Sequence, residues 1–363
     1  MLDDILLISF PGGVRSSQPI YLPTFAPSSR PLAKLVFTVR QRTDRISTLG
    51  DAWTVKKQPS HRLPRYAVLL VVAAELCGSF CLRARAESFE LPALSSPAND
   101  THLVGKLIWL DLETTDLPGS KRFYHSLFGW DYRDYHADGV EYTLALVNGN
   151  PVAGLLRRQI VNETERRSAW LPFFSVADVN ATFQQALKAH AQVRSEPEQL
   201  PLRGRQARLT DPEGAVFALV TSSSGDPSDD PNPRAVGTWG SPSLLARNPA
   251  REAVFYQELF SYAVFAEPTD RGKRIRLSSG PQERANVRQL PTVVDALHPQ
   301  WISFVRVFSN ADTARQAVKL GGHILVAATR ATHGASITIL DDPTGAAFGV
   351  IELPPEIVDL ETP

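Results

Sequence analysis

One strand-like segment carries the side chains best suited to chemistry. Residues 106–114 read KLIWLDLET, in which Trp109, Asp111 and Glu113 alternate with aliphatic residues. This period of two predicts a strand with those three side chains on one face. Such a face could contact a polar ligand, for example a cation stacked on Trp109. The alternative is that the two carboxylates mark a strand end in contact with water, as charged residues usually do.

Arg306 is a second candidate, near the other end of the chain. It follows Ile302 by four residues in WISFVRVF, so a strand there would place both side chains on one face. A guanidinium group at this position could bind an anionic ligand through two hydrogen bonds. It could equally form an ion pair with a nearby carboxylate, and the sequence leaves both interpretations open.

Composition excludes several classes of function. The formal net charge of the 363 residues is zero and hydrophobic residues make up 43%, so no nucleic-acid partner is expected. Both cysteines, Cys77 and Cys81, precede residue 100, which excludes disulfide and cysteine-based zinc chemistry from the rest of the chain. The sequence has no glycine-rich phosphate loop, no nucleophile elbow and no histidine pair at the i, i+4 spacing of a metal site.

A segment of about 120 residues occurs twice, and three landmarks recur at a constant offset. Phe123-Tyr124 in FYHSLFGW returns 132 positions later in FYQELFSY. Trp170 returns 131 positions later as Trp301, and the Asp-Pro-x-Gly sequence at 211 returns at 342, which is also 131 positions. We call residues 103–222 the first repeat and residues 236–355 the second repeat. Residues 223–235, rich in Pro, Ser and Asp, are predicted to be the linker between them.

Each repeat is predicted to contain two modules of the order βαβββ. In the first module the strand 106–114 precedes a helix that starts at Asp116 and ends at Gly129, and strands turning at residues 148–150 follow it. In the second module the strand beginning at Trp170 precedes a helix over residues 178–190 and three further strands. The chain therefore holds four modules. The first strand of the second repeat is expected to be irregular, because Pro242 interrupts it.

The first hundred residues differ from the repeats. Residues 1–60 have scattered Pro and Ser without periodicity and are expected to be poorly ordered. Residues 61–102 contain the apolar run AVLLVVAAELCGSFCL after several basic residues and before Ala84-Arg85-Ala86, the order of a secretory signal. The run is short for a membrane span, so no stable span is expected in the mature form. This interpretation predicts a periplasmic or secreted protein and a true start near residue 60. A buried N-terminal helix and lipid attachment at Cys77 are the less favoured alternatives.

The order of these motifs resembles the vicinal oxygen chelate superfamily, which includes glyoxalase I, bleomycin-resistance proteins and extradiol dioxygenases. The resemblance rests on Asp116 seven residues before Phe123-Tyr124, on LFGW, on NGNPVAGL and on the Asp-Pro-x-Gly hairpin before the last strand. It covers both repeats. It implies an α+β fold in which the four βαβββ modules form two glyoxalase-like domains, with curled, cup-shaped mixed sheets and the ligand inside the cup.

The resemblance also implies positions for the ligands of a divalent metal. In the first repeat these positions are occupied by Trp109, Leu171 and Ala218, and in the second by Ser241, Ile302 and Gly349. A metal site needs three or more good oxygen, nitrogen or sulfur donors, so we expect neither a metal nor another cofactor. The candidate ligand-binding residues are therefore those on the inward faces: Trp109, Asp111, Glu113, Leu171, Phe173, Ala218 and Arg306.

Three functions remain open. The first is an exported protein that binds a small organic molecule in a metal-free cup, as bleomycin-resistance proteins bind without catalysis. The second is a metal-dependent lyase or dioxygenase of the same superfamily. The third is a structural or interaction protein whose cups are filled by its own side chains. Because good metal donors are missing, the sequence favours a protein that is not an enzyme. The sequence does not determine the oligomeric state.

Overall fold

The computed structural model describes residues 91–137, 140–158, 168–229, 235–269, 272–291, 297–330 and 335–353. These residues belong to one compact unit. The expected disorder of residues 1–60, the signal-like run and Cys77 lie outside the described residues. No helix in the described part of the chain combines the length and apolar character that crossing a membrane requires.

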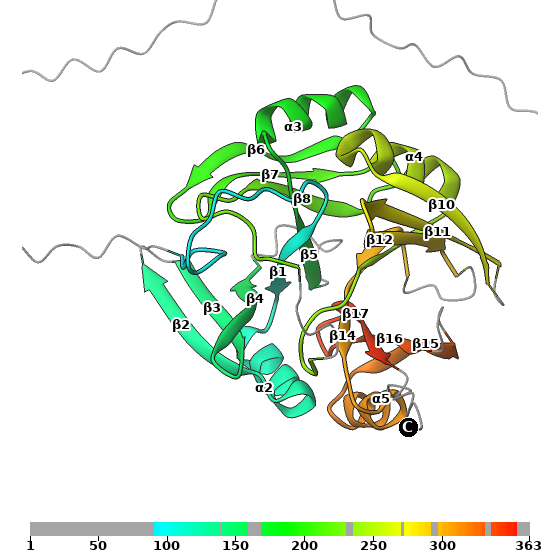
Figure 1. Cartoon of the computed structure of the whole chain (residues 1–363). Helices are drawn as coiled ribbons and strands as arrows, with labels where there is room; N and C mark the ends of the chain where they lie inside the picture. The colour runs from blue at the N-terminus through cyan, green and yellow to red at the C-terminus, as the bar shows by residue number, and fades with distance from the viewer. Residues whose placement is uncertain are drawn as a thin grey trace, which may run out of the picture. The chain divides into compact units, whose positions relative to one another are not determined.

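The first repeat contains the two predicted modules (Figure 1). The first module consists of β1 (Leu107–Thr114), α2 (Leu117–Phe128), β2 (Asp131–Ala137), β3 (Val140–Val147) and β4 (Asn150–Arg157). The second module consists of β5 (Ala169–Ser175), α3 (Val179–Lys188), β6 (Gln192–Leu200), β7 (Gly204–Thr210) and β8 (Val216–Thr221). The prediction of βαβββ order is confirmed for both modules.

The second repeat has the same order with one interruption. Its first module consists of β9 (Ser243–Ala246), α4 (Pro249–Phe260), β10 (Ala263–Thr269), β11 (Gly272–Ser279) and β12 (Gln282–Gln289). Its second module consists of β13 (Gln300–Ile302), β14 (Phe304–Arg306), α5 (Asn310–Lys319), β15 (His323–Arg330), β16 (Ser336–Asp341) and β17 (Ala347–Glu352). Strand β9 is short and begins directly after Pro242, as the sequence indicates. Strands β13 and β14 together correspond to β5 of the first repeat.

The modules of the first repeat join edge to edge. Its eight strands form one mixed sheet in the order β2-β3-β4-β1-β5-β8-β7-β6, in which β1 and β5 are antiparallel. The second repeat has the equivalent order, but the break between β13 and β14 divides it into sheets of five and four strands. The result is the predicted α+β fold with mixed sheets.

Local sequence accounts for the ends of helix α2. The Asp116 side chain accepts a hydrogen bond from the Gly119 amide at 3.0 Å, which satisfies one of the free N–H groups of the first turn. Gly129 ends the helix in the left-handed conformation with φ of 71°, which glycine adopts without steric cost. Both ends lie where the sequence predicts them.

The hydrophobic core explains how the repeats are assembled. Two buried clusters contain helix residues, and each of them mixes the two repeats: one joins α3 and α4 with their sheets, and the other includes residues of α2 and α5. The helices of each pair contact each other (Figure 1). Two other clusters contain no helix residue, and each is confined to one repeat and its flanking residues. The helix-bearing faces of the sheets therefore pack between the repeats. We call the opposite face of each sheet its inner face.

The three sequence landmarks meet where the repeats contact each other. The Tyr124 hydroxyl of α2 donates to the Asp342 carboxylate of the second repeat at 3.2 Å and accepts from the Trp170 indole at 2.9 Å. Asp342 also accepts backbone hydrogen bonds from Thr344 and Ala346 within its own turn. Because Tyr124 and Asp342 are buried, these bonds satisfy polar groups that water does not reach.

An equivalent contact exists with the roles of the two repeats exchanged. The Tyr256 hydroxyl of α4 donates to the Asp211 carboxylate of the first repeat at 3.1 Å and accepts from the Trp301 indole at 3.0 Å. Burial raises the pKa of Asp211, as it does that of Asp342. The landmarks that reveal the repeat therefore hold the two repeats together, and Trp170 and Trp301 pack against the tyrosines at this contact.

Candidate ligand site on the inner face of the first repeat

A buried polar cluster lies on the inner face around β1. The Trp109 indole and the Tyr142 hydroxyl both donate to the same Asp111 carboxylate oxygen, at 2.8 and 2.7 Å. Asp111 is only 7% exposed, so the alternative of a water-exposed strand end is wrong for this residue. Burial and the Asp111 charge raise the pKa of Tyr142 well above its ordinary value, which keeps its hydroxyl protonated as a donor.

Close approach of β4 makes this cluster possible. Gly154 lies directly opposite Asp111 in the parallel pair of β1 and β4. A Cβ atom at this position would overlap the Tyr142 hydroxyl and the Asp111 carboxylate. Glycine is therefore required here by the space that the hydrogen bond between Asp111 and Tyr142 occupies.

The chain supplies its own cation to Trp109. The Arg203 guanidinium, from the turn between β6 and β7, lies 4.4 Å from the centre of the Trp109 ring and 5.5 Å from that of Tyr142. It also donates to the Tyr142 hydroxyl at 3.2 Å. Arg203 is 2% exposed, which makes it part of the buried cluster. The stacked cation that the sequence suggests is thus present as a protein side chain.

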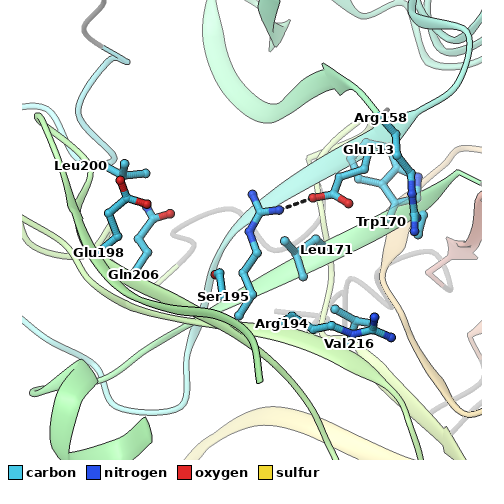
Figure 2. Close-up of a pocket in the computed structure, with 12 residues that line it drawn as sticks. Glu113, Arg158, Trp170, Leu171, Arg194, Ser195, Glu198, Leu200, Gln206 and Val216 are labelled. Atoms are coloured by element: carbon cyan, nitrogen blue, oxygen red, sulfur yellow. Dashed lines mark hydrogen bonds and ion pairs between the residues drawn. The ribbon is translucent and has the colours of Figure 1, made fainter. Parts of the chain in front are cut away.

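A pocket of about 450 Å³ opens on the same inner face, beyond this cluster. Arg208 of β7 forms an ion pair with Glu113 of β1 inside it. Figure 2 shows Glu113 on one side of the pocket and Glu198 and Gln206 on the other. Leu171 and Val216 provide apolar surface. The volume lies in the range of small-molecule sites, and the lining combines apolar surface with a few charged groups.

The structure brings most of the predicted residues together. Trp109, Leu171, Phe173 and Ala218 belong to one buried cluster on the inner face. Asp111 is paired with Leu171 across the β1–β5 ladder, and Glu113 and Leu171 line the pocket.

Arg306 lies elsewhere. It belongs to β14 of the second repeat and donates to the Thr238 hydroxyl at 2.8 Å. It also lines a different cavity of about 530 Å³, together with Lys106 and Asp229. Arg306 therefore forms no part of the site in the first repeat.

Three residues of the site were missed from the sequence. Arg208 stands in RQARLTD, where strand alternation alone would have placed it on the same face as Gln206. Tyr142 lies in a predicted strand, but its position opposite Asp111 depends on strand order. Arg203 lies in a turn, and no local pattern connects it with Trp109.

The positions that the resemblance assigns to metal ligands in the first repeat do not fit a metal. The indole of Trp109, the isobutyl group of Leu171 and the methyl group of Ala218 offer no donor, and Asp111 is engaged by two hydrogen bonds. Within the described ranges, His, Cys, Asp and Glu side chains form no group of three that could hold an ion.

Comparison with known proteins agrees with this fold. Residues 106–219 match the family model described as the Glyoxalase/Bleomycin resistance protein/Dioxygenase superfamily. The chain therefore carries a domain of this superfamily in its first repeat. The second repeat has the same module order and landmarks.

Two relatives match most of the chain. CFP32 of Mycobacterium tuberculosis (strain CDC 1551 / Oshkosh), provisionally named a glyoxylase, is 26% identical over 263 residues, 72% of this chain and 99% of its own. The anthracycline biosynthesis protein DnrV of Streptomyces peucetius is 29% identical over 267 residues, 69% of this chain and 94% of its own. Among solved structures, the Mn(II)-bound glyoxalase from Novosphingobium aromaticivorans is similar with a TM-score of 0.49 and 16% identity, over 69% of this chain and 83% of that chain.

Proposed function

We propose that the protein binds a small organic molecule in the pocket on the inner face of the first repeat, without a divalent metal. The observation that carries the proposal is the 450 Å³ pocket in which the Arg208–Glu113 ion pair lies beside Leu171. The polar groups orient a ligand and the apolar surface supplies binding energy. The name of DnrV, an anthracycline biosynthesis protein, supports an organic ligand.

The ion pair sets the chemistry of the ligand. Arg208 and Glu113 are partly exposed to the pocket, with side-chain exposures of 35% and 21%. A ligand with a hydrogen-bond acceptor can bind Arg208, and one with a donor can bind Glu113, so a ligand carrying both groups fits best. Leu171 would contact its carbon skeleton.

A thermal-shift screen with small aromatic and aliphatic acids, alcohols and amides tests this proposal. A ligand that binds the folded state raises the melting temperature of the wild-type protein. Arg208→Gln is expected to abolish that increase, whereas Arg315→Gln, on the surface of α5, keeps it. Equal increases in wild type and Arg208→Gln would place the ligand elsewhere.

Metal analysis separates this proposal from its main alternative. That alternative is a metal-dependent enzyme of the superfamily, such as a lyase, and the provisional name of CFP32 as a glyoxylase favours an enzyme. Purified protein is expected to contain substoichiometric divalent metal by mass spectrometry. One tightly bound ion per chain would contradict metal-free binding and favour the enzyme.

We also propose export to the periplasm or the exterior. The support is the order of basic, apolar and small residues over positions 56–86. N-terminal sequencing of the natural protein tests it, with a mature chain beginning shortly after Ala86 as the expected result. A chain beginning near Met1 would contradict it.

A further inference from the structure

The cavity of about 530 Å³ that Arg306 lines lies where the two repeats meet, and we call it the junction cavity. Equivalent segments of both repeats line it: residues 107–110 and 150–152 and, 132 positions later, residues 239–242 and 282–284. The parallel ladders β1–β4 and β9–β12 have the same register at this offset. Neither repeat therefore forms the junction cavity alone.

The two repeats contribute different charges to this shared cavity. Lys106 directly precedes β1, where the second repeat has Thr238. Arg284 lies in β12, where the first repeat has Val152. The side chains of Lys106 and Arg284 are largely buried, with exposures of 14% and 9%. Two cations, one from each repeat, therefore line the cavity together.

One carboxylate, from the linker, binds both cations. Asp229 forms an ion pair with Lys106 at 3.2 Å and accepts hydrogen bonds from both terminal nitrogens of Arg284. Burial lowers the pKa of Lys106, and Asp229 opposes this only in part. The buried Nε atom of Arg284 has no hydrogen-bond partner among the described residues. Two positive charges thus share one negative charge, which favours a further anion.

The other charged groups in the lining are engaged by neighbours. Glu283 forms an ion pair with Arg274, which is not among the residues described as lining the cavity. Arg306 donates to the Thr238 hydroxyl at 2.8 Å and to the backbone oxygen of Trp239. Lys106 and Arg284 are therefore the cations best placed to bind an anion in the cavity.

Apolar surface completes the cavity. Ile108 and Trp109 of the first repeat and Pro242 of the second line it and are buried, so they form its floor. Four lining residues are exposed and mark its mouth: Asn150, Pro151, Ser241 and Gln282. The volume lies in the range of small-molecule sites, and a few charged groups on an apolar surface suit an organic ligand.

We propose that the junction cavity binds a small organic monoanion with an apolar body, such as an aromatic carboxylate. Its anionic group binds Lys106 and Arg284 beside Asp229, and its body lies against Ile108 and Trp109. This site is independent of the function proposed for the first repeat, because the described linings of the two cavities have no residue in common.

Calorimetric titration of the wild-type protein with 2-naphthoate, and with the uncharged 2-naphthamide, tests the preference for an anion. The carboxylate is expected to bind about tenfold more tightly than the amide, or better, because only the carboxylate compensates the second cation. Equal affinity for both compounds, or no naphthoate binding at millimolar concentration, would overturn the proposal.

Asp229→Asn gives the sharpest test, because it is expected to improve binding. The substitution removes the counter-charge that Lys106 and Arg284 share, so naphthoate should bind about threefold more tightly than to wild type, or better. A folding defect would weaken binding and cannot imitate this gain. Unchanged or weaker binding would contradict the assignment of Lys106 and Arg284 as the groups that bind the anion.

Further variants locate the site. Arg284→Gln is expected to weaken naphthoate binding about tenfold or more, and Ser241→Trp, at the exposed mouth, to abolish it without removing a charge. Arg208→Gln in the first repeat and Arg315→Gln on α5 are expected to leave it unchanged, with melting temperatures confirming that each variant folds. If Arg208→Gln abolishes naphthoate binding and Ser241→Trp does not, the anion binds in the first repeat and the junction site is refuted.

Discussion

The two repeats are alike where they contact each other and different on their inner faces. At the contact, Tyr124 with Asp342 is matched by Tyr256 with Asp211 at nearly the same distance. On the inner faces, the neutral Tyr142 is replaced by the charged Arg274 at the equivalent position. At the contact, residues of one repeat must fit residues of the other, so a change in either repeat would disturb the packing of both. Each inner face packs within its own repeat and can therefore take a different chemistry.

The strongest test of the comparison removes the aspartates at the contact. Asp211→Ala and Asp342→Ala are each expected to lower the free energy of unfolding by roughly 3 kcal/mol or more, because each leaves a buried tyrosine hydroxyl and several backbone N–H groups without an acceptor. Urea unfolding measures both effects. A large loss for one variant and less than about 0.5 kcal/mol for the other would show that the two contacts are not equivalent.

A smaller effect is expected on the inner face of the first repeat. Gly154→Ala places a methyl group where the Tyr142 hydroxyl and the Asp111 carboxylate lie. We expect a loss of roughly 2 kcal/mol, the usual cost of overfilling a packed site, measured by urea unfolding. The matched variant is Gly240→Ala, where the added methyl group makes only ordinary contacts with Phe304 and Ile351, so the expected loss is below about 0.5 kcal/mol. A loss for Gly240→Ala as large as that for Gly154→Ala would contradict the special role of Gly154.

The two equivalent contacts between the repeats differ at one position, and this difference predicts that the stability of the protein depends on pH. Glu252 of α4 is fully buried beside Asp211 and Glu213, whereas the equivalent residue of α2 is Ser120, which is hydrogen-bonded to Thr114. Burial and the Asp211 charge raise the pKa of Glu252 to about 8, from an ordinary value of 4.5, and Arg251 opposes this only in part. Between these two pH values the folded protein holds a proton that the unfolded chain releases, so stability falls as pH rises through this range.

Glu252→Gln removes this dependence, because glutamine does not ionise. The variant is expected to gain roughly 1 kcal/mol or more relative to wild type at pH 8, and little or nothing at pH 5, because the difference grows by up to about 1.4 kcal/mol for each pH unit between the two pKa values. Thermal unfolding across this pH range measures the difference, with Ser120→Ala as the pH-independent control. A gain that is the same at pH 5 and pH 8 would show that Glu252 does not titrate in the folded protein.

Local features of the fold were predictable from sequence because each depends on a few neighbouring residues. Asp116 and Gly129 mark the ends of α2 through a side-chain cap and a left-handed turn, and both are recognisable without knowledge of the fold. The fixed offset of the landmarks is also visible in the sequence alone, and it predicts two repeats of two modules each. The candidate site was predictable in part: alternation in KLIWLDLET places Trp109, Asp111 and Glu113 on one face, but does not show what faces them.

The sequence by itself determined the order of the modules, the repeat and the lack of three good metal donors at the positions that the resemblance implies. Only the tertiary structure showed that Arg203 stacks on Trp109 from 94 positions away, and that Arg288 lies opposite Arg274. It also showed that the repeated tyrosine, tryptophan and aspartate meet at the contact between repeats. These pairings depend on strand register and on the packing of distant segments, whose free energy is not encoded in any short stretch of sequence.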